Sequence, residues 1–326
     1  MGYPCIERMR SFVRVRPLAA LSLSALALVA LAGCSSSPSG TATPSASATT
    51  AVDLCSAGAA SGAASDAVTV SGDFGGAVTA SFTSPLDIPE FQRTVVITGD
   101  GAPLAQGDIV NYAVTTFDPS TGAQTYAASS ANSTALPLQL SSSSALGQIL
   151  GCSPIGSRIT AVFPATESTS AEVDVIDVLG VTPAAAWGTP QEPVAGMPTV
   201  ALDADGAPTV TLPGTDAPTE TQVETLKKGD GATVASGDTV LVQYSGSLWS
   251  DGTVFDSSWS RGAPASLSTT GVVTGFQKAL EGQTVGSQVL VVIPPADGYG
   301  DKAQGSIPAN STLVFVIDIL ATQHAS

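Results

Sequence analysis

The chain of 326 residues is long enough for two domains of ordinary size, and its formal net charge of −16 makes it strongly acidic. Such a charge repels the phosphate backbone of nucleic acids and anionic lipid headgroups, so we expect no nucleic-acid partner and no membrane binding by charge. Charged residues make up only 12% of the chain, whereas Ala, Ser, Thr, Gly and Pro abound. This composition favours short strands and turns over long helices.

Residues 1–33 have the pattern of an export signal. Several arginines, from Arg8 to Arg16, precede an apolar run over residues 18–31 that is short for a membrane span. The run ends in residues 31–34 (LAGC), which resemble the lipoprotein box of bacterial lipoproteins. The resemblance implies cleavage before Cys34, a lipid anchor on Cys34 and a place on the extracytoplasmic face of the cell membrane. The alternatives are an ordinary secretory signal and a short membrane anchor.

Residues 34–65 are predicted to form a flexible tether, because their Ser-, Thr-, Pro- and Ala-rich start cannot bury a core. After cleavage and lipidation, Cys55 and Cys152 remain as the ordinary thiols. Outside the cytoplasm such a pair is often a disulfide, and two buried free thiols are the alternative. No Cys-x-x-Cys spacing occurs, which argues against redox catalysis.

An internal repeat follows the tether. Residues 99–102 (GDGA) match residues 229–232, and residues 107–108 (GD) match residues 237–238 at the same offset. Further matches come in the same order along the chain: residues 155–157 with 285–287, Pro164 with Pro294, and residues 173–179 with 315–320. One Gly-Asp-Gly could arise by chance, but several segments in one order indicate two copies of one domain.

We place the two copies at residues 66–180 and 198–322, joined by a Pro-rich, semi-stiff linker at residues 181–197. Most segments of the second copy alternate as strands do, and the one helical stretch, residues 276–280, ends before Gly282, where a left-handed residue is favoured. The predicted fold class is therefore α+β: an antiparallel sheet wrapped over one short helix, in two tandem copies of which the first is degenerate.

Residues 237–258 of the second copy predict a β-hairpin. An alternating strand that contains Tyr244 leads to a turn at residues 251–252 (DG), a pair that tolerates positive φ. The chain then returns through Phe255 to Asp256. Two aromatic rings and one carboxylate are therefore expected at the mouth of one small sheet.

The residue types that most catalytic and metal sites need are missing. His324 is the single histidine, and its place at the end of the chain predicts a frayed tail residue. No Ser-His-Asp or Cys-His constellation can be assembled without it, and the sequence contains no zinc-ligand cluster and no phosphate-binding Gly-rich loop. We expect no metal and no cofactor.

Apolar and aromatic residues at turns and strand ends stand out instead. Most of them could be ordinary core, but Tyr299 lies in the loop 296–300 (ADGYG), where a ring would normally be exposed. The motifs around these residues resemble, in order, those of the FK506-binding protein family of peptidyl-prolyl isomerases. They are residues 244–248 (YSGSL), 251–258 (DGTVFDSS), 272–276 (VVTGF), 280–286 (LEGQTVG), 293–295 (IPP), 298–300 (GYG), 307–308 (IP) and 313–320 (LVFVIDIL).

The resemblance covers about residues 225–321 and implies a pocket for a prolyl ring. Carried over residue by residue, it implies catalytic roles for Tyr244, Phe255, Asp256 and Tyr299. It implies substrate-binding roles for the following residues: Arg261, Val272, Val273, Phe276, Ile307 and Phe315.

The implied function is that of a peptidyl-prolyl cis-trans isomerase (EC 5.2.1.8) that acts on X-Pro bonds of secreted or cell-surface proteins as an extracytoplasmic folding factor. The alternative is a non-catalytic chaperone or binding module for Pro-containing segments. FK506- and rapamycin-type macrolides are the implied small-molecule ligands. Membrane attachment would come only through the lipid on Cys34.

Three positions depart from the family pattern. Phe276 stands where the family usually has tryptophan, Ala265 where it usually has an aromatic residue, and Ser306 where it usually has an apolar one. We expect a pocket that is shallower on the side of Ala265 and Ser306, which bears on macrolide affinity more than on isomerisation.

The first copy has lost most of this set. Val114 stands at the place of Tyr244, and Tyr126 remains near the place of the Phe-Asp pair without a carboxylate. No Gly-Tyr-Gly loop follows Pro164. We interpret this copy as a degenerate domain kept either as a spacer or as a platform for client binding.

Overall fold

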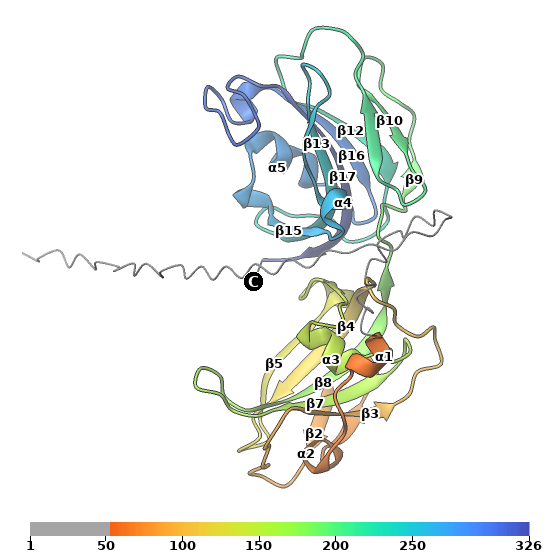
Figure 1. Ribbon diagram of the computed structural model, residues 1–326, viewed down its shortest axis with the longest axis vertical. Coiled ribbons are helices and arrows are strands. Elements are labelled where there is room, and N and C mark those ends of the chain that lie inside the picture. The colour runs from red at the N-terminus through yellow and green to blue at the C-terminus, as the bar shows by residue number, and fades with distance from the viewer. Residues whose placement is uncertain (1–52, 326) are drawn as a thin grey trace, which may run out of the picture. The chain divides into compact units, whose positions relative to one another are not determined.

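The computed structural model describes residues 53–325 (Figure 1). The predicted signal peptide, the lipidation site at Cys34 and the first part of the tether lie outside the described residues. In the described part of the chain, no helix is both long enough and apolar enough to span a bilayer. These residues form mainly antiparallel strands, arranged in two large sheets and two small hairpins.

The second sheet has seven strands, and its strand order is β14-β13-β17-β16-β12-β9, with β15 paired to β13. The long central strands β13 and β17 pair along their whole length, from Thr239 opposite Gln323 to Leu248 opposite Leu313. The strands are β9 (Thr189–Pro190), β12 (Gln222–Lys228), β13 (Thr239–Leu248), β14 (Val254–Ser257), β15 (Ala265–Ser268), β16 (Gln288–Ile293) and β17 (Leu313–Gln323).

One face of this sheet packs against the helix α5 (Thr274–Leu280), as Figure 1 shows. Phe276, Ala279 and Leu280 are buried in one core cluster with the strand residues of that face. Burial of a large apolar side chain contributes roughly 1.5–3 kcal/mol, so this contact holds a helix too short to be stable alone. Gly275 permits the close approach, because a Cβ there would lie 2.4 Å from Ile293.

The opposite face is covered by the hairpin of β10 (Thr199–Leu202) and β11 (Pro208–Thr211). The preceding residues, predicted as a linker, also pack along this sheet. Ala186 donates its backbone N–H to Asp318 Oδ2 at 2.8 Å, and Val194 donates its N–H to Glu224 Oε1 at 2.8 Å. The Pro-rich composition of the segment could not predict these contacts, because the acceptors are buried carboxylates that lie far away in the sequence.

The remaining short helices of this part connect strands. They are α4 (Ser258–Arg261) and the 3-10 turns η2 (Thr269–Gly271) and η3 (Pro295–Asp297). Gly282 follows α5 with φ of 80°, the left-handed conformation expected from the sequence.

The first sheet has six strands in the order β3-β7-β8-β4-β5, with β6 paired to β4. They are β3 (Gln92–Ile97), β4 (Ile109–Phe117), β5 (Gln124–Ser129), β6 (Leu138–Gln139), β7 (Arg158–Phe163) and β8 (Glu172–Thr182). The helix α3 (Ala145–Leu150) packs on one face, and the hairpin of β1 (Thr69–Gly72) and β2 (Val78–Ser81) covers the other. A 3-10 turn, η1 (Ser130–Asn132), follows β5.

The end of the predicted tether is ordered. Two short helices, α1 (Leu54–Ala57) and α2 (Ala63–Asp66), precede the first sheet, and Leu54 is buried against α3. A disulfide joins Cys55 to Cys152, with the two Cα atoms 4.6 Å apart. The predicted tether, residues 34–65, therefore included residues that are part of the fold, because composition alone does not show that Leu54 is buried.

His324 is not a frayed residue. Strand β17 continues to Gln323, and the His324 Nδ1 atom lies 2.9 Å from Asp238 Oδ2. Asp238 is buried and also accepts hydrogen bonds from the Thr322 hydroxyl and the backbone N–H of Ala235. Pairing of β17 with the start of β13 brings the chain end to this carboxylate.

Candidate active site

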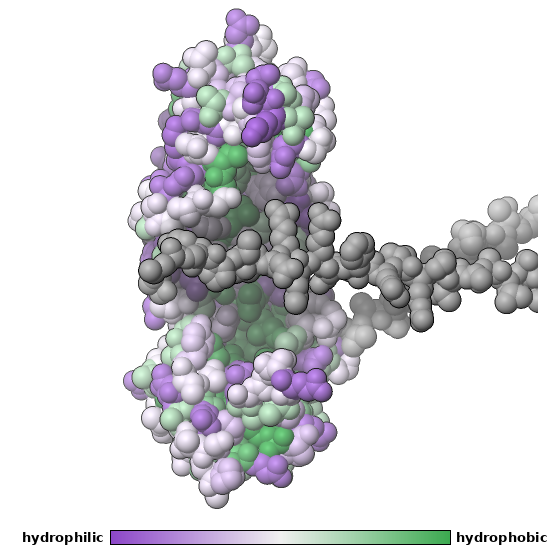
Figure 2. All heavy atoms as spheres, turned by 90° about the vertical axis from the view of Figure 1, so that its left-hand side faces the viewer, coloured by the Kyte–Doolittle hydropathy of each residue, from purple (hydrophilic) through white to green (hydrophobic). Residues whose placement is uncertain are grey.

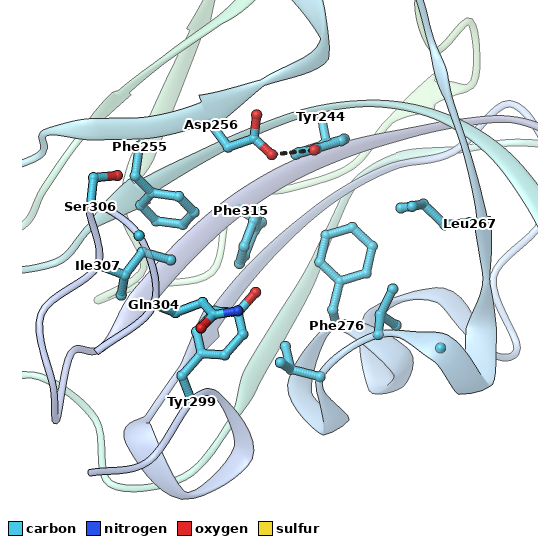
Figure 3. Close-up of a pocket in the computed structure, with 14 residues that line it drawn as sticks. Tyr244, Phe255, Asp256, Leu267, Phe276, Tyr299, Gln304, Ser306, Ile307 and Phe315 are labelled. Atoms are coloured by element: carbon cyan, nitrogen blue, oxygen red, sulfur yellow. Dashed lines mark hydrogen bonds between the residues drawn. The ribbon is translucent and has the colours of Figure 1, made fainter. Parts of the chain in front are cut away.

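A pocket of about 790 Å³ opens beside α5, between β14 and the loop that follows η3 (Figure 3). All the predicted site residues except Arg261 line it. The lining residues are Tyr244, Phe255, Asp256, Leu267, Gly271, Val272, Val273, Phe276, Tyr299, Gln304, Gly305, Ser306, Ile307 and Phe315. The surface view in Figure 2 shows polar and apolar side chains intermingled, with hydrophobic residues gathered where the surface is hollowed.

Aromatic rings packed edge to face form the floor of the pocket. Phe315 lies at its centre: its ring centroid is 5.0 Å from that of Phe276 and 5.5 Å from that of Phe255, each at 84°. Tyr244 meets Phe276 at 6.1 Å and 88°. Edge-to-face pairs add roughly 0.5–1.5 kcal/mol each to the gain from burial, so the floor is rigid and apolar.

Gly246 makes this floor possible. It lies opposite both Asp256 and Phe315 in the sheet. A Cβ at this position would lie 2.5 Å from Phe315 Cε1 and 2.8 Å from Phe255 Cζ. The two rings therefore rest directly on the backbone of β13, which only a glycine allows.

A network of three polar side chains forms one rim. The Tyr244 hydroxyl donates to Asp256 Oδ2, and Arg261 pairs with Asp256 Oδ1. Arg261 Nη2 also donates to the Tyr244 hydroxyl at 2.9 Å, and the guanidinium carbon lies 5.4 Å from the centre of the Tyr244 ring. Arg261 does not line the pocket itself. It fixes Asp256 and Tyr244, which do.

The network shifts the titration of its members. Burial opposes ionisation of Asp256, but hydrogen bonds from Tyr244 and Arg261 outweigh it and hold the pKa of the carboxyl below its usual range. Burial, reinforced by the hydrogen bond to Asp256, raises the pKa of the Tyr244 hydroxyl. At neutral pH the carboxylate is thus ionised and the phenol protonated, an arrangement suited to holding shape rather than to moving protons.

Ser258, the first residue of α4, anchors this rim to the sheet. It is fully buried, its hydroxyl donates to Gln243 Oε1 at 2.5 Å, and the backbone N–H of Tyr244 donates back to it at 2.8 Å. The same residue therefore fixes the Tyr244 backbone and the start of the turn that carries Arg261.

Tyr299 stands on the opposite rim, where its side chain points into the pocket (Figure 3). The residue is 37% exposed, and within residues 53–325 its hydroxyl has no hydrogen-bond partner. Its loop is held by Asp297, which accepts from Lys278 at 2.7 Å and from the Thr221 hydroxyl at 2.5 Å. The phenol is thus held over the pocket by a fixed loop while its own donor stays available.

Sequence reasoning missed four lining residues: Leu267, Gly271, Gln304 and Gly305. Alternation along β15 could have identified Leu267, because it shares a face with Ala265 and that face packs against the core. Leu267 supplies an apolar wall on the side where Ala265 predicted a shallower pocket. Gln304 was not predictable from periodicity: it lies in the pocket because its backbone pairs with that of Ile307 in a tight turn.

The aromatic floor and its two rims form a pocket that can receive an apolar ring or side chain. In the described part of the chain, no cluster of three or more metal-ligating side chains occurs. Residues 231–320 match the family described as FKBP-type peptidyl-prolyl cis-trans isomerase. The "FKBP-type 22 kDa peptidyl-prolyl cis-trans isomerase" of Escherichia coli is 45% identical over 100 residues, which are 30% of this chain and 48% of that protein.

A "Probable FK506-binding protein" of Corynebacterium glutamicum is 37% identical over 93 residues, which are 28% of this chain and 79% of that protein. The chain in the crystal structure of FkpA from Escherichia coli is 32% identical in sequence to this one. The match covers 41% of this chain and 54% of the FkpA chain, with a TM-score of 0.32. The chain belongs to the FKBP-type peptidyl-prolyl cis-trans isomerase family. It spans less than half the length of the first curated relatives that it matches.

Proposed function

We propose that this protein catalyses cis-trans rotation of X-Pro peptide bonds, and that the pocket of the second sheet is the active site. The observation that carries the proposal is the pocket itself: a floor of packed aromatic rings, one rim fixed by the Tyr244–Asp256–Arg261 network and the other rim formed by Tyr299.

The physics of the reaction needs no nucleophile, metal or general base. The barrier to rotation is about 18–20 kcal/mol, and uncatalysed exchange takes tens of seconds or longer. Because the barrier is resonance energy, the amide is less polar when twisted than when planar. An apolar pocket therefore stabilises the twisted state more than water does, which is the differential binding that accelerates a reaction.

The pocket residues take separate roles in this mechanism. Phe255, Phe276 and Phe315 receive the prolyl ring. The Tyr299 hydroxyl and the backbone N–H of Val273 donate to substrate carbonyl groups, which holds the chain on one side of the bond while the other side turns. Asp256 positions Tyr244 and the rim.

The proposal is tested by nuclear magnetic resonance exchange on a short peptide with one X-Pro bond. Phe255→Ala and Asp256→Val are expected to lower kcat/KM at least tenfold, whereas Val254→Ala, on the same strand but 58% exposed, should match the parent. Catalysis by both site variants at the parental rate would overturn the site assignment. Peptide binding without exchange in the parent would favour the non-catalytic module instead.

We also infer that the first sheet arose as a second copy of the same domain. Its strand order β5-β4-β8-β7-β3 corresponds to β14-β13-β17-β16-β12, and each sheet packs one short helix on one face and one hairpin on the other. The repeated motifs support the same inference. An isolated fragment of residues 53–180 that catalysed prolyl exchange would contradict the view that this copy lost its site.

For its location we propose the extracytoplasmic face of a bacterial membrane, with Cys34 as the lipidated residue and secreted polypeptides as substrates. The signal-like residues 1–33, the LAGC motif and the Cys55–Cys152 disulfide support this proposal. Metabolic labelling with a fatty acid should mark the parent and not Cys34→Ala. Equal labelling of both would refute the anchor without touching the proposed catalysis.

A further inference from the structure

The first sheet carries polar groups where the second sheet carries its pocket floor. In the second sheet one row across the strands reads Asp256, Gly246, Phe315 and Val291. The corresponding row of the first sheet reads Tyr126, Thr116, Asp174 and Ala161. A carboxylate thus replaces the central phenylalanine, and a phenol replaces the rim carboxylate.

Apolar side chains lie around this row, and they remain partly exposed. Four of them are only partly buried and pack against one core cluster; we call them the first-sheet patch: Phe91, Val114, Leu146 and Phe163. The rings of Phe91 and Phe163 stack with centroids 4.7 Å apart and planes 13° apart. Tyr126 is 53% exposed.

The patch stays open because one loop is short. In the second sheet, residues 294–312 connect β16 to β17 and bring Tyr299 and Ile307 over the pocket. In the first sheet, residues 164–171 connect the corresponding strands and are too few to form such a wall. The same floor position therefore lacks the wall that Tyr299 and Ile307 form in the second sheet.

The free charges around the patch are negative. Glu172 lies opposite Phe163 in the sheet, and Asp174 Oδ1 accepts a hydrogen bond from the Thr116 hydroxyl at 2.7 Å. Burial raises the pKa of Asp174 to about 6, with Glu172 adding to the rise. No lysine or arginine among the described residues pairs with Asp174.

The two arginines of residues 53–182 are already engaged. Arg158 pairs with Asp177 at 2.6 Å in a buried site. Arg93 donates to the backbone carbonyl groups of Ala59, Ile149 and Leu150. Bonds to carbonyl groups leave the Arg93 guanidinium charged, and Arg93 lies opposite Ala161 at the far end of the row. The uncompensated negative charge is therefore on the side of Asp174 and Glu172, where it stands beside apolar side chains and selects for a cationic and apolar ligand.

We propose that the first-sheet patch binds an extended segment of unfolded polypeptide in which a Lys or Arg stands next to apolar side chains, with the cation at Asp174 and the apolar groups on Phe91 and Phe163. Such a segment needs no proline. The protein would then hold a client at the first sheet independently of X-Pro binding at the second.

The test uses the full chain and fluorescent, proline-free peptides, with binding measured by anisotropy. One peptide alternates Leu and Phe with Lys, a second replaces Lys by Glu, and a third keeps Lys but replaces Leu and Phe by Ser. We expect the first peptide to bind at least tenfold more tightly than either of the others, and its binding to weaken as salt is added.

Asp174→Asn keeps an acceptor for Thr116 and should weaken binding of the Lys peptide about tenfold, as expected for a partly buried charge pair. Phe91→Ala should weaken it as well. The matched control Asp100→Asn removes an exposed carboxylate elsewhere and should change affinity less than twofold. Phe255→Ala should leave peptide binding intact while lowering isomerisation, so failure of this proposal and failure of the proposed catalysis are separate results.

Three outcomes would overturn the proposal. The Glu peptide could bind as tightly as the Lys peptide, or Asp174→Asn could match the parent. A photo-crosslinking amino acid at position 126 could react with residues 1–52 or with a second copy of the chain in place of the peptide, which would assign the patch a different occupant.

Discussion

Gly246→Ala adds one methyl group beneath the pocket floor and tests whether the aromatic rings shape the site. The new Cβ would lie 2.5 Å from Phe315 and 2.8 Å from Phe255. Carbon atoms pack at about 3.5–4.0 Å, so both rings must move by roughly 1 Å, away from the sheet and into the pocket. Overpacking of this kind costs about 1–3 kcal/mol.

The change in activity should exceed the change in stability. Alanine restricts the unfolded chain and recovers about 0.4–1 kcal/mol, so the net loss of unfolding free energy should stay within about 2 kcal/mol. The shallower pocket should lower kcat/KM for a short X-Pro peptide about tenfold or more, equivalent to about 1.4 kcal/mol.

The assay compares Gly246→Ala with Gly271→Ala, a pocket-lining glycine where a Cβ would meet nothing closer than 3.5 Å. Exchange kinetics on a short X-Pro peptide and urea unfolding are measured for both. The control should retain parental kcat/KM. A Gly246→Ala protein that folds and keeps kcat/KM within twofold of the parent would refute the idea that Phe255 and Phe315 contact the prolyl ring.

Three further changes have defined outcomes. Tyr299→Phe removes one donor from an otherwise intact rim and should lower kcat about two- to tenfold in the exchange assay; an unchanged kcat would remove the hydroxyl from the mechanism. Asp174 keeps its proton in the native state up to about pH 6 but loses it near pH 3.8 when unfolded, so stability falls as pH rises between these values. Urea titrations of Asp174→Asn should lack that fall and show about 1–2 kcal/mol more stability at pH 7; a parental pH profile would contradict this. The Cys55–Cys152 disulfide closes a loop with a sequence separation of 97, and its reduction should lower the unfolding free energy of the first sheet by about 2–4 kcal/mol. Circular dichroism in urea, with and without reductant, measures this loss. Equal unfolding midpoints would show that the disulfide adds no stability.

Sequence patterns predicted the parts of the molecule that depend on interactions between residues close in sequence, such as turns and strand alternation. The Asp-Gly turn and the alternating strands around it placed Tyr244, Phe255 and Asp256 at one end of a sheet, and in the structure Asp256 contacts Tyr244 and Arg261 there. The lone aromatic in a Gly-rich loop identified Tyr299 as a residue outside the core, and it lines the pocket.

Long-range pairing decided the rest. Whether His324 frays depends on how far β17 continues along β13, which no local pattern records. The backbone of Ala186 in the predicted linker is held by Asp318, a contact that composition cannot reveal. Gln304 enters the pocket through a turn whose shape depends on Ile307.

If the pocket of the second sheet turns X-Pro bonds, exchange spectroscopy on a peptide with a single X-Pro bond will detect it. The parent chain should accelerate exchange far beyond the uncatalysed rate. Phe255→Ala should abolish most of that acceleration, and an FK506-type macrolide that occupies the pocket should inhibit it. A folded parent chain that leaves the exchange rate at its uncatalysed value would show that the pocket is not an isomerase site.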